Sequence, residues 1–178
     1  MKNYQLHTIT LHALNATSTT GVLSLGARNL PCSLGKSGSG SRKREGDGLT
    51  PQGTLPLLWL YYRPDRLRRP KTLLPVYPLT QSMGWCDDPR DPNYNQPVPW
   101  PYQSSAEHLW RQDHIYDLIV VLGFNFNPCR KHNGSAIFWH LSRDNFSPTA
   151  GCIAIEKKEM LKLLERCGPQ TRLIVGQK

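Results

Sequence analysis

A cysteine and a histidine mark two short apolar runs in the last third of the chain. The runs are Ala136–Leu141, which contains His140, and Cys152–Ile155, which begins directly after Gly151. Gly or Pro residues bound both runs, a pattern that predicts two buried strands. The eleven residues between His140 and Cys152 leave room for a hairpin or for adjacent strands that bring the two side chains into contact. Because a thiolate is a nucleophile and an imidazole can remove the thiol proton, this pair predicts nucleophilic catalysis.

The residues just before Cys152 suit the charge that such catalysis develops. Gly151 has no side chain to block a substrate, and the backbone N–H groups at Ala150 and Gly151 can face an oxyanion. A plainer interpretation stays open on residue type alone. A buried cysteine is usually a small core residue, and a histidine at a strand end is usually just hydrogen-bonded.

The elements that must position this pair are mostly strands. Short β-type runs predict a meander at the start of the chain, at Tyr4–Leu14, Gly21–Leu25 and Asn29–Leu34. Further apolar runs predict strands at Leu55–Tyr62, Leu73–Leu79, Tyr116–Leu122 and Thr171–Val175.

The clearest helix signal follows the second apolar run, over Glu156–Arg166. Apolar residues recur there at helical spacing, at Met160, Leu161, Leu164 and Cys167, and Gly168-Pro169 ends the pattern. We therefore expect a single domain over residues 1–178 that is mainly β, a sandwich or partly closed barrel with one main helix.

Two loops are candidates for the walls of a cleft. Two glycines flank Asp47 in Arg42–Gly48, so this turn can present Arg44 and Asp47 in fixed directions. Five prolines predict that Gly84–Ser105 is irregular, and a loop of that length is usually functional. Its amphipathic residues suit a peptide or sugar surface, among them Trp85, Tyr94 and Asn95.

The same region holds two weaker signals. Asp87 and Asp88 are adjacent carboxylates, for which turn stabilisation is a better interpretation than acid–base chemistry or Ca²⁺ binding. Ser104–Arg111 predicts one or two helical turns, with Ser105 as the cap.

Composition limits the remaining classes of function. The formal charge of +9 is concentrated at Arg42–Arg44 and between Arg63 and Lys71, which invites polyanions, yet no nucleic-acid-binding motif accompanies it. We read no secretory signal and no run long enough to cross a membrane. The five cysteines predict no disulfide framework. Zinc binding by Cys129, His132, His140 and Cys152 stays open, although their spacing lacks the paired knuckles of structural zinc sites.

Several short motifs between Lys43 and Ile155 resemble the L,D-transpeptidase catalytic domain (YkuD-like) family, cysteine enzymes that modify peptidoglycan. They occur in order as Lys-Arg-Glu-Gly-Asp-Gly, Thr-Pro-x-Gly-Thr, Gly-Trp-Cys-Asp-Asp-Pro, Tyr-Asn, Tyr-Asp, Gly-Ser-Ala-Ile-Phe-x-His and Pro-Thr-x-Gly-Cys. They match a short-chain bacterial branch of that family most closely. The chain departs from the general family pattern at Ala150, where a His is usual, and at Ala154, where an Arg is frequent.

The resemblance implies a fold of the kind expected above and a peptidoglycan L,D-transpeptidase. Cys152 would attack a stem-peptide carbonyl, His140 would be the base, and backbone N–H groups near Ala150 and Gly151 would hold the oxyanion. The branch is associated with links from L-Ala to meso-diaminopimelate. Substrate-binding residues would be Arg44, Glu45, Asp47, Trp85, Tyr94, Asn95, Ser135 and Thr149.

The resemblance also implies partners and a location. We expect muropeptides as substrates, no cofactor, no metal, no nucleic-acid partner, a monomer, and a place in the periplasm or cell envelope. Three alternatives remain: an L,D-carboxypeptidase or peptidoglycan amide hydrolase, a non-catalytic wall-binding module, and a nucleic-acid binder that uses the basic clusters. Thiol reactivity separates the first from the others, since a catalytic Cys152 should alkylate rapidly below the pKa of a free thiol.

Overall fold

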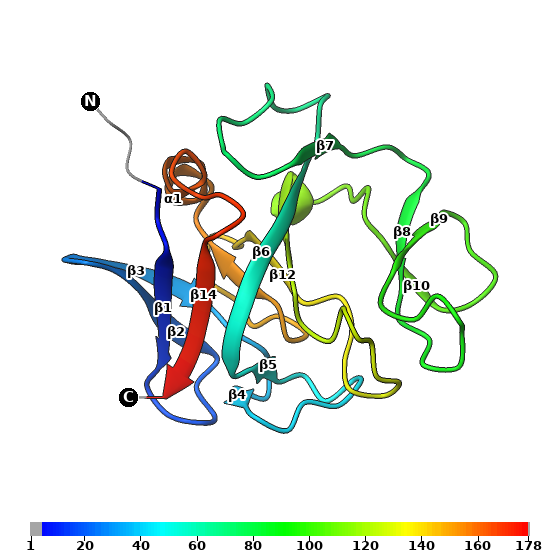
Figure 1. Cartoon of the computed structure of the whole chain (residues 1–178), viewed down its shortest axis with the longest axis horizontal. Coiled ribbons are helices and arrows are strands. Elements are labelled where there is room, and N and C mark those ends of the chain that lie inside the picture. Colours follow the sequence, from blue (N-terminus) through cyan, green and yellow to red (C-terminus); the bar gives the residue numbers. More distant parts are fainter. Residues whose placement is uncertain (1–4, 178) are drawn as a thin grey trace.

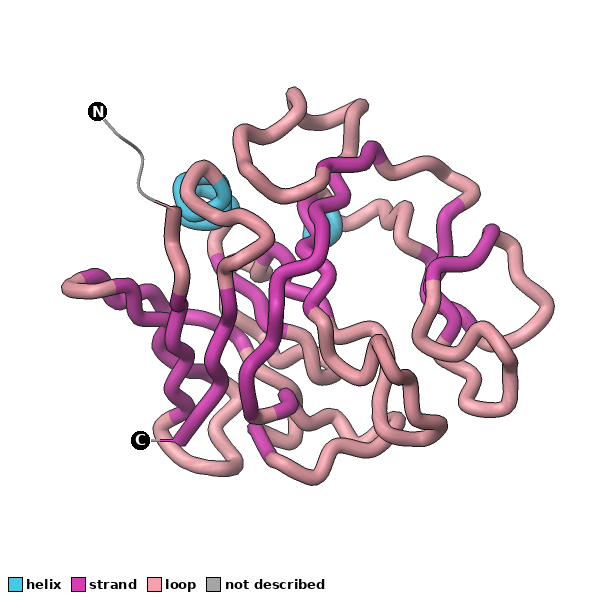
Figure 2. The backbone as a smooth tube through the Cα atoms, in the orientation of Figure 1, coloured by secondary structure: helices cyan, strands magenta, loops and turns pink. Residues whose placement is uncertain are grey.

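The computed structural model describes residues 5–177, whose regular secondary structure is mainly β-strand (Figure 1 and Figure 2). The longer strands are β1 (Thr8–Ala13), β2 (Thr20–Leu25), β3 (Arg28–Ser33), β6 (Gly53–Tyr62), β11 (Leu118–Leu122), β12 (Phe138–Leu141), β13 (Ile153–Ile155) and β14 (Arg172–Gln177). The shorter ones are β4 (Ser39–Gly40), β5 (Thr50–Pro51), β7 (Val76–Pro78), β8 (Met83–Cys86), β9 (Pro97–Pro99) and β10 (Ala106–His108). The helical elements of this range are the 3₁₀ turn η1 (His114–Tyr116) and the helix α1 (Lys157–Leu164).

The main sheet closes on itself. Its strand order is β11-β12-β13-β3-β2-β1-β14-β6-β7, and β11 also pairs with β6. Eight strands therefore form a closed ring, and β7 continues along the edge of β6 beyond β14. The expected mainly β fold with one main helix is confirmed, and the barrel closes fully because β6 is long enough to pair with β14 through its first half and β11 through its second.

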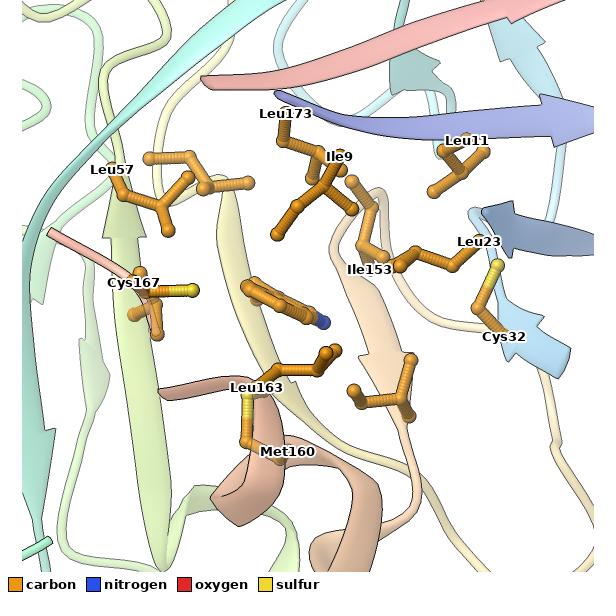
Figure 3. Close-up of a cluster of buried hydrophobic side chains, with 14 of the residues drawn as sticks. Ile9, Leu11, Leu23, Cys32, Leu57, Ile153, Met160, Leu163, Cys167 and Leu173 are labelled. Carbon is orange, nitrogen blue, oxygen red and sulfur yellow. The ribbon is translucent and has the colours of Figure 1, made fainter. Parts of the chain in front are cut away.

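The interior of this barrel is the larger hydrophobic core. Side chains from opposite strands meet there with those of α1, as the close-up of Ile9, Leu23, Ile153, Met160 and Leu163 shows (Figure 3). The helix prediction is confirmed within a few residues at each end, and Met160, Leu164 and Cys167 are buried as expected.

A second core lies outside the barrel, between β11, β12 and a small sheet. This sheet has three strands in the order β10-β8-β9 (Figure 1). Alternation along β11 divides its side chains between the two cores: Leu118, Val120 and Leu122 face inward, whereas Ile119 and Val121 face the small sheet. All five are buried because both faces of the strand are covered.

The small sheet overturns two expectations. Gly84–Ser105 is not wholly irregular, since β8 and β9 pair within it, and Ser104–Arg111 contains the strand β10 instead of helical turns. Prolines are tolerated at positions 97 and 99 because β9 is the edge strand, where a missing N–H donor faces no partner strand. The pairing of β10 with β8 outweighs the weak local helix signal.

The remaining predicted strands are found with shifted ends. The opening meander forms as β1, β2 and β3, and the runs near residues 55–62, 76–78, 118–122 and 172–177 are strands. Tyr4, where the first predicted run begins, lies outside the described residues. Within residues 5–177 we find no helix with the length and apolar character needed to span a membrane.

Candidate active site

Parallel pairing places His140 and Cys152 on the same side of the barrel wall. In β12 and β13, Trp139 lies opposite Ile153 and His140 lies opposite Ala154. Trp139 and Ile153 point into the barrel, so alternation turns His140 and Cys152 outward, toward the small sheet. The two strands are adjacent, one of the two arrangements expected, and their parallel direction excludes a hairpin.

Both side chains line a pocket of about 450 Å³ between the barrel and the loops that cover it. Charged residues of both signs surround the pair, including Lys36, Lys43, Glu107 and Arg111. Among the expected substrate-binding residues, Glu45, Ser135 and Thr149 also line this pocket.

The ring of His140 is fixed by the backbone. Its Nδ1 atom lies 2.9 Å from the carbonyl oxygen of Leu141. A carbonyl accepts and cannot donate, so the neutral imidazole carries its proton on Nδ1 and leaves Nε2 as a proton acceptor. Burial lowers the pKa of His140 to about 4, against a weaker upward effect of the Leu141 hydrogen bond. The ring of Tyr116 packs edge-on against the imidazole, with 5.1 Å between centroids.

The thiol of Cys152 is also held by backbone groups. Its Sγ atom donates to the carbonyl oxygen of Ala136 at 3.2 Å and accepts the N–H of Phe138 at 3.4 Å. Burial, with a smaller contribution from the nearby charge of Glu107, raises the pKa of Cys152 to about 12. The pair therefore rests as neutral thiol and neutral imidazole, so slow alkylation of the free protein does not exclude a catalytic cysteine.

The turn before Cys152 is built around Thr149. Its Oγ1 atom donates to the carbonyl oxygen of Cys152 at 2.6 Å and accepts the N–H of Gly151 at 3.1 Å. Gly151 has φ = +138°, and a Cβ atom there would lie 2.8 Å from the carbonyl oxygen of Leu49. Glycine is needed here because this φ is strained for any other residue and because the Leu49 carbonyl leaves no room for a Cβ atom. The Gly151 N–H is occupied by Thr149 in this state, and an oxyanion role for Gly151 and Ala150 stays a prediction.

Three expected substrate-binding residues are buried scaffold positions. Trp85 and Asn95 are joined by a hydrogen bond of 3.0 Å from the indole Nε1 to the amide oxygen, which also accepts the N–H of Ala136 at 3.0 Å. The Tyr94 hydroxyl donates to Glu45 and accepts the N–H of Gly134. These contacts tie the small sheet and the 42–48 loop to the segment that leads into β12. The three residues therefore support the walls of the pocket without lining it.

The remaining two lie in the 42–48 loop but outside the pocket. Asp47 accepts hydrogen bonds from the Lys43 ammonium and from the N–H groups of Arg44 and Leu49. Burial pushes the pKa of Asp47 upward, but these hydrogen bonds outweigh it and leave the pKa lowered. The side chain of Arg44 is exposed and lines a separate pocket with Asn125.

Sequence patterns missed several pocket residues. Glu107 and Tyr116 form a hydrogen bond of 2.6 Å from the phenol to the carboxyl group, beside His140. Arg111 forms a bidentate pair with Asp113 and stands over the Tyr116 ring. Alternation across Ala106–His108 was the available signal, and it was obscured because the run is too short to distinguish from a helical turn.

Two further observations concern the cysteines and the zinc-binding alternative. All five cysteines are free. No group of three or more His, Cys, Asp or Glu side chains within residues 5–177 is arranged to hold a metal ion.

Comparison with known proteins places this chain in a family. A comparison with curated protein sequences found no match. A comparison with models of protein families matched residues 19–175 to the L,D-transpeptidase catalytic domain, YkuD. The match extends from β2 to β14 and includes the His140–Cys152 pair. Since it covers most of the chain, the protein belongs to the L,D-transpeptidase catalytic domain (YkuD) family.

Proposed function

We propose that this protein is a peptidoglycan L,D-transpeptidase that cross-links stem peptides through an acyl-Cys152 intermediate. The family is typically one of cysteine-based transpeptidases that act on peptidoglycan, which supports this assignment. The observation that carries the proposal is the common pocket of Cys152 and His140, in which Leu141 leaves the Nε2 atom of His140 free to act as a base.

The reaction begins when the thiol leaves the carbonyl of Ala136 and gives its proton to His140. Sulfur attacks a carbonyl carbon of the donor stem, and the leaving amine takes the proton back from the imidazole. An acceptor amine then attacks the thioester, with meso-diaminopimelate as the expected source. As the resemblance to the short-chain branch implies, the proposed donor bond lies inside the stem, next to L-Ala.

Hydrolysis is the main competing outcome, because water can attack the same thioester. A pocket walled by the small sheet and the 42–48 loop limits access of water and favours a bound amine. We therefore propose transfer as the main activity, with L,D-carboxypeptidase or amide hydrolase activity as the alternative. The envelope location follows from the proposed substrate.

The direct test is intact mass spectrometry of the protein incubated with purified muropeptides. An adduct on Cys152, together with dimeric muropeptides in the product, supports the proposal. Added D-amino acids or glycine derivatives should divert the intermediate to exchange products. Shortened stems without dimers or exchange products would assign a hydrolase, and binding without any adduct would assign a wall-binding module.

A further inference from the structure

Most positive charges of the catalytic pocket already have partners. Lys43 pairs with Asp47, and Asp113 pairs with both Arg111 at 2.8 Å and Arg143 at 3.2 Å. Lys36 remains, and its side chain is exposed at the pocket mouth. The protein therefore supplies few free cations to the interior of this pocket.

Three carboxylates of the same pocket, Glu45, Asp87 and Glu107, have no such partner. Among the described residues, none of the three takes part in an ion pair. Glu45 accepts the hydroxyl of Tyr94. The Oδ1 atom of Asp87 is buried and accepts no hydrogen bond within residues 5–177. Buried acceptors are nearly always satisfied, so this oxygen is open to a hydrogen-bond donor that enters the pocket.

Glu107 is the one of the three carboxylates whose charge acts on Cys152. It lies in β10 opposite Trp85 of β8, and its carboxyl group accepts the hydroxyl of Tyr116 at 2.6 Å. Burial raises the pKa of Glu107, with Asp87 as a smaller contribution, while Tyr116 and Arg111 oppose the shift. A carboxylate of raised pKa is a better proton acceptor than an ordinary one.

The charge of Glu107 acts on the two halves of the reaction in opposite directions. Before acylation it disfavours the Cys152 thiolate, because like charges repel. After acylation the sulfur is uncharged and this penalty disappears. The same carboxylate then attracts a positively charged acceptor toward the thioester.

We propose that Glu107 forms the acceptor subsite of this pocket, binding the primary ammonium group of the incoming nucleophile, with the charge of Asp87 adding to the attraction. This inference rests on the proposed acyl-Cys152 intermediate. It assigns the choice between amine and water to Glu107, because water carries no charge for this carboxylate to attract.

The proposed step balances its protons. The ammonium group gives one proton to the Glu107 carboxylate, and the free amine attacks the thioester carbon. The new C–N bond forms as the C–S bond breaks. His140 moves a second proton from the attacking nitrogen to the departing sulfur, which returns to the thiol. Glu107 then releases its proton to solvent.

The test is Glu107→Gln, which keeps an oxygen to accept the Tyr116 hydroxyl and removes the charge. Glu165→Gln is the matched control, because Glu165 is exposed at the end of α1 and does not line the pocket. Each protein is treated with iodoacetamide to measure alkylation of Cys152. Each is then incubated with muropeptides and increasing glycine amide to measure exchange against hydrolysis.

We expect Glu107→Gln to alkylate at Cys152 about tenfold faster than wild type, because a like charge is removed. We expect its ratio of exchange to hydrolysis to fall by about tenfold, because the ammonium loses its partner. General damage to the pocket would not raise the rate of Cys152 alkylation while lowering the ratio of exchange to hydrolysis. Glu165→Gln should match wild type in both measurements.

The outcomes separate this inference from the function on which it rests. If wild type forms acyl-Cys152 but Glu107→Gln keeps the wild-type ratio of exchange to hydrolysis, the acceptor subsite is wrong and the transpeptidase assignment stands. Unchanged alkylation in Glu107→Gln removes the electrostatic basis of the inference. If wild type forms no acyl-enzyme with any muropeptide, both proposals are overturned.

Discussion

The carbonyl oxygen of Leu141 lies 2.9 Å from the Nδ1 atom of the preceding residue, His140. This contact within one strand decides which nitrogen of the ring can act as a base. Residue types alone do not say whether a backbone carbonyl or a loop side chain orients the imidazole, and here it is the carbonyl of Leu141. Since the orienting group is backbone, no substitution of the Leu141 side chain removes it.

The first prediction concerns the nucleophile and base. Cys152→Ala should abolish both the covalent adduct and the cross-linked products, because no other pocket group can form the thioester. His140→Ala should lower turnover by about 10²-fold or more, the usual contribution of a positioned general base. Rates come from product chromatography, and circular dichroism checks that both variants fold. Wild-type activity in Cys152→Ala would contradict the assignment of the nucleophile.

The second prediction concerns the resting charge of the thiol. Because burial raises the pKa of Cys152 to about 12, its alkylation in the free protein should be slow at neutral pH. The rate should rise about tenfold per pH unit up to about pH 10, without a plateau, as the thiolate fraction grows. Peptide mapping separates Cys152 from the other four cysteines. A plateau near pH 7 would show a preformed thiolate and refute the neutral resting pair.

The third prediction links His140 to acid stability. The pKa of this imidazole is about 4 when folded and 6.5 in its ordinary state, so the unfolded chain binds the proton first as pH falls. Stability from His140 is therefore complete above about pH 6.5 and is lost toward pH 4, by about 3 kcal/mol. Urea unfolding at several pH values measures it, with His140→Leu as the comparison. The slope over this range should be smaller in the variant.

The fourth prediction concerns the turn that presents Cys152. Gly151→Ala should lower the free energy of unfolding by about 2 kcal/mol or more, and turnover with it. The cause is the approach of its new methyl group to the carbonyl of Leu49, on backbone that already has φ = +138°. Gly26→Ala is the control, since φ is +59° there and open space surrounds the position. If the two variants lose equal stability, the close approach to Leu49 carries no cost.

The fifth prediction separates two residues of the 42–48 loop. Asp47→Ala should lower turnover and increase loop proteolysis, because Asp47 holds the Lys43 ammonium and two backbone N–H groups. Arg44→Ala should leave stability near that of wild type, since its side chain is exposed, and should raise the KM for muropeptides through the separate pocket that it lines with Asn125. Alkylation of Cys152 at fixed pH should stay near wild type in Arg44→Ala. A large drop in that rate would give Arg44 a role at the sulfur.

Local patterns in the sequence were enough to predict many of the barrel strands and the pair of His140 and Cys152. The runs around His140 and Cys152 are short, apolar and bounded by turn residues, so their strand character does not depend on distant partners. The helix after Ile155 is similarly local, because its spacing and its Gly-Pro stop lie within one segment. The shared motifs identified the family for the same reason: they are contiguous stretches of residues.

Features that depend on contacts between distant segments could be seen only in the tertiary structure. Prolines 97 and 99 argue against a strand until β8 is known to lie beside β9. Trp85 and Asn95 look like exposed binding residues until the barrel wall is packed against them. Glu107 enters the pocket only because β10 pairs with β8, about 45 residues before Cys152 in the chain. The elevated pKa of the thiol likewise follows from burial, a property of packing that residue spacing does not contain.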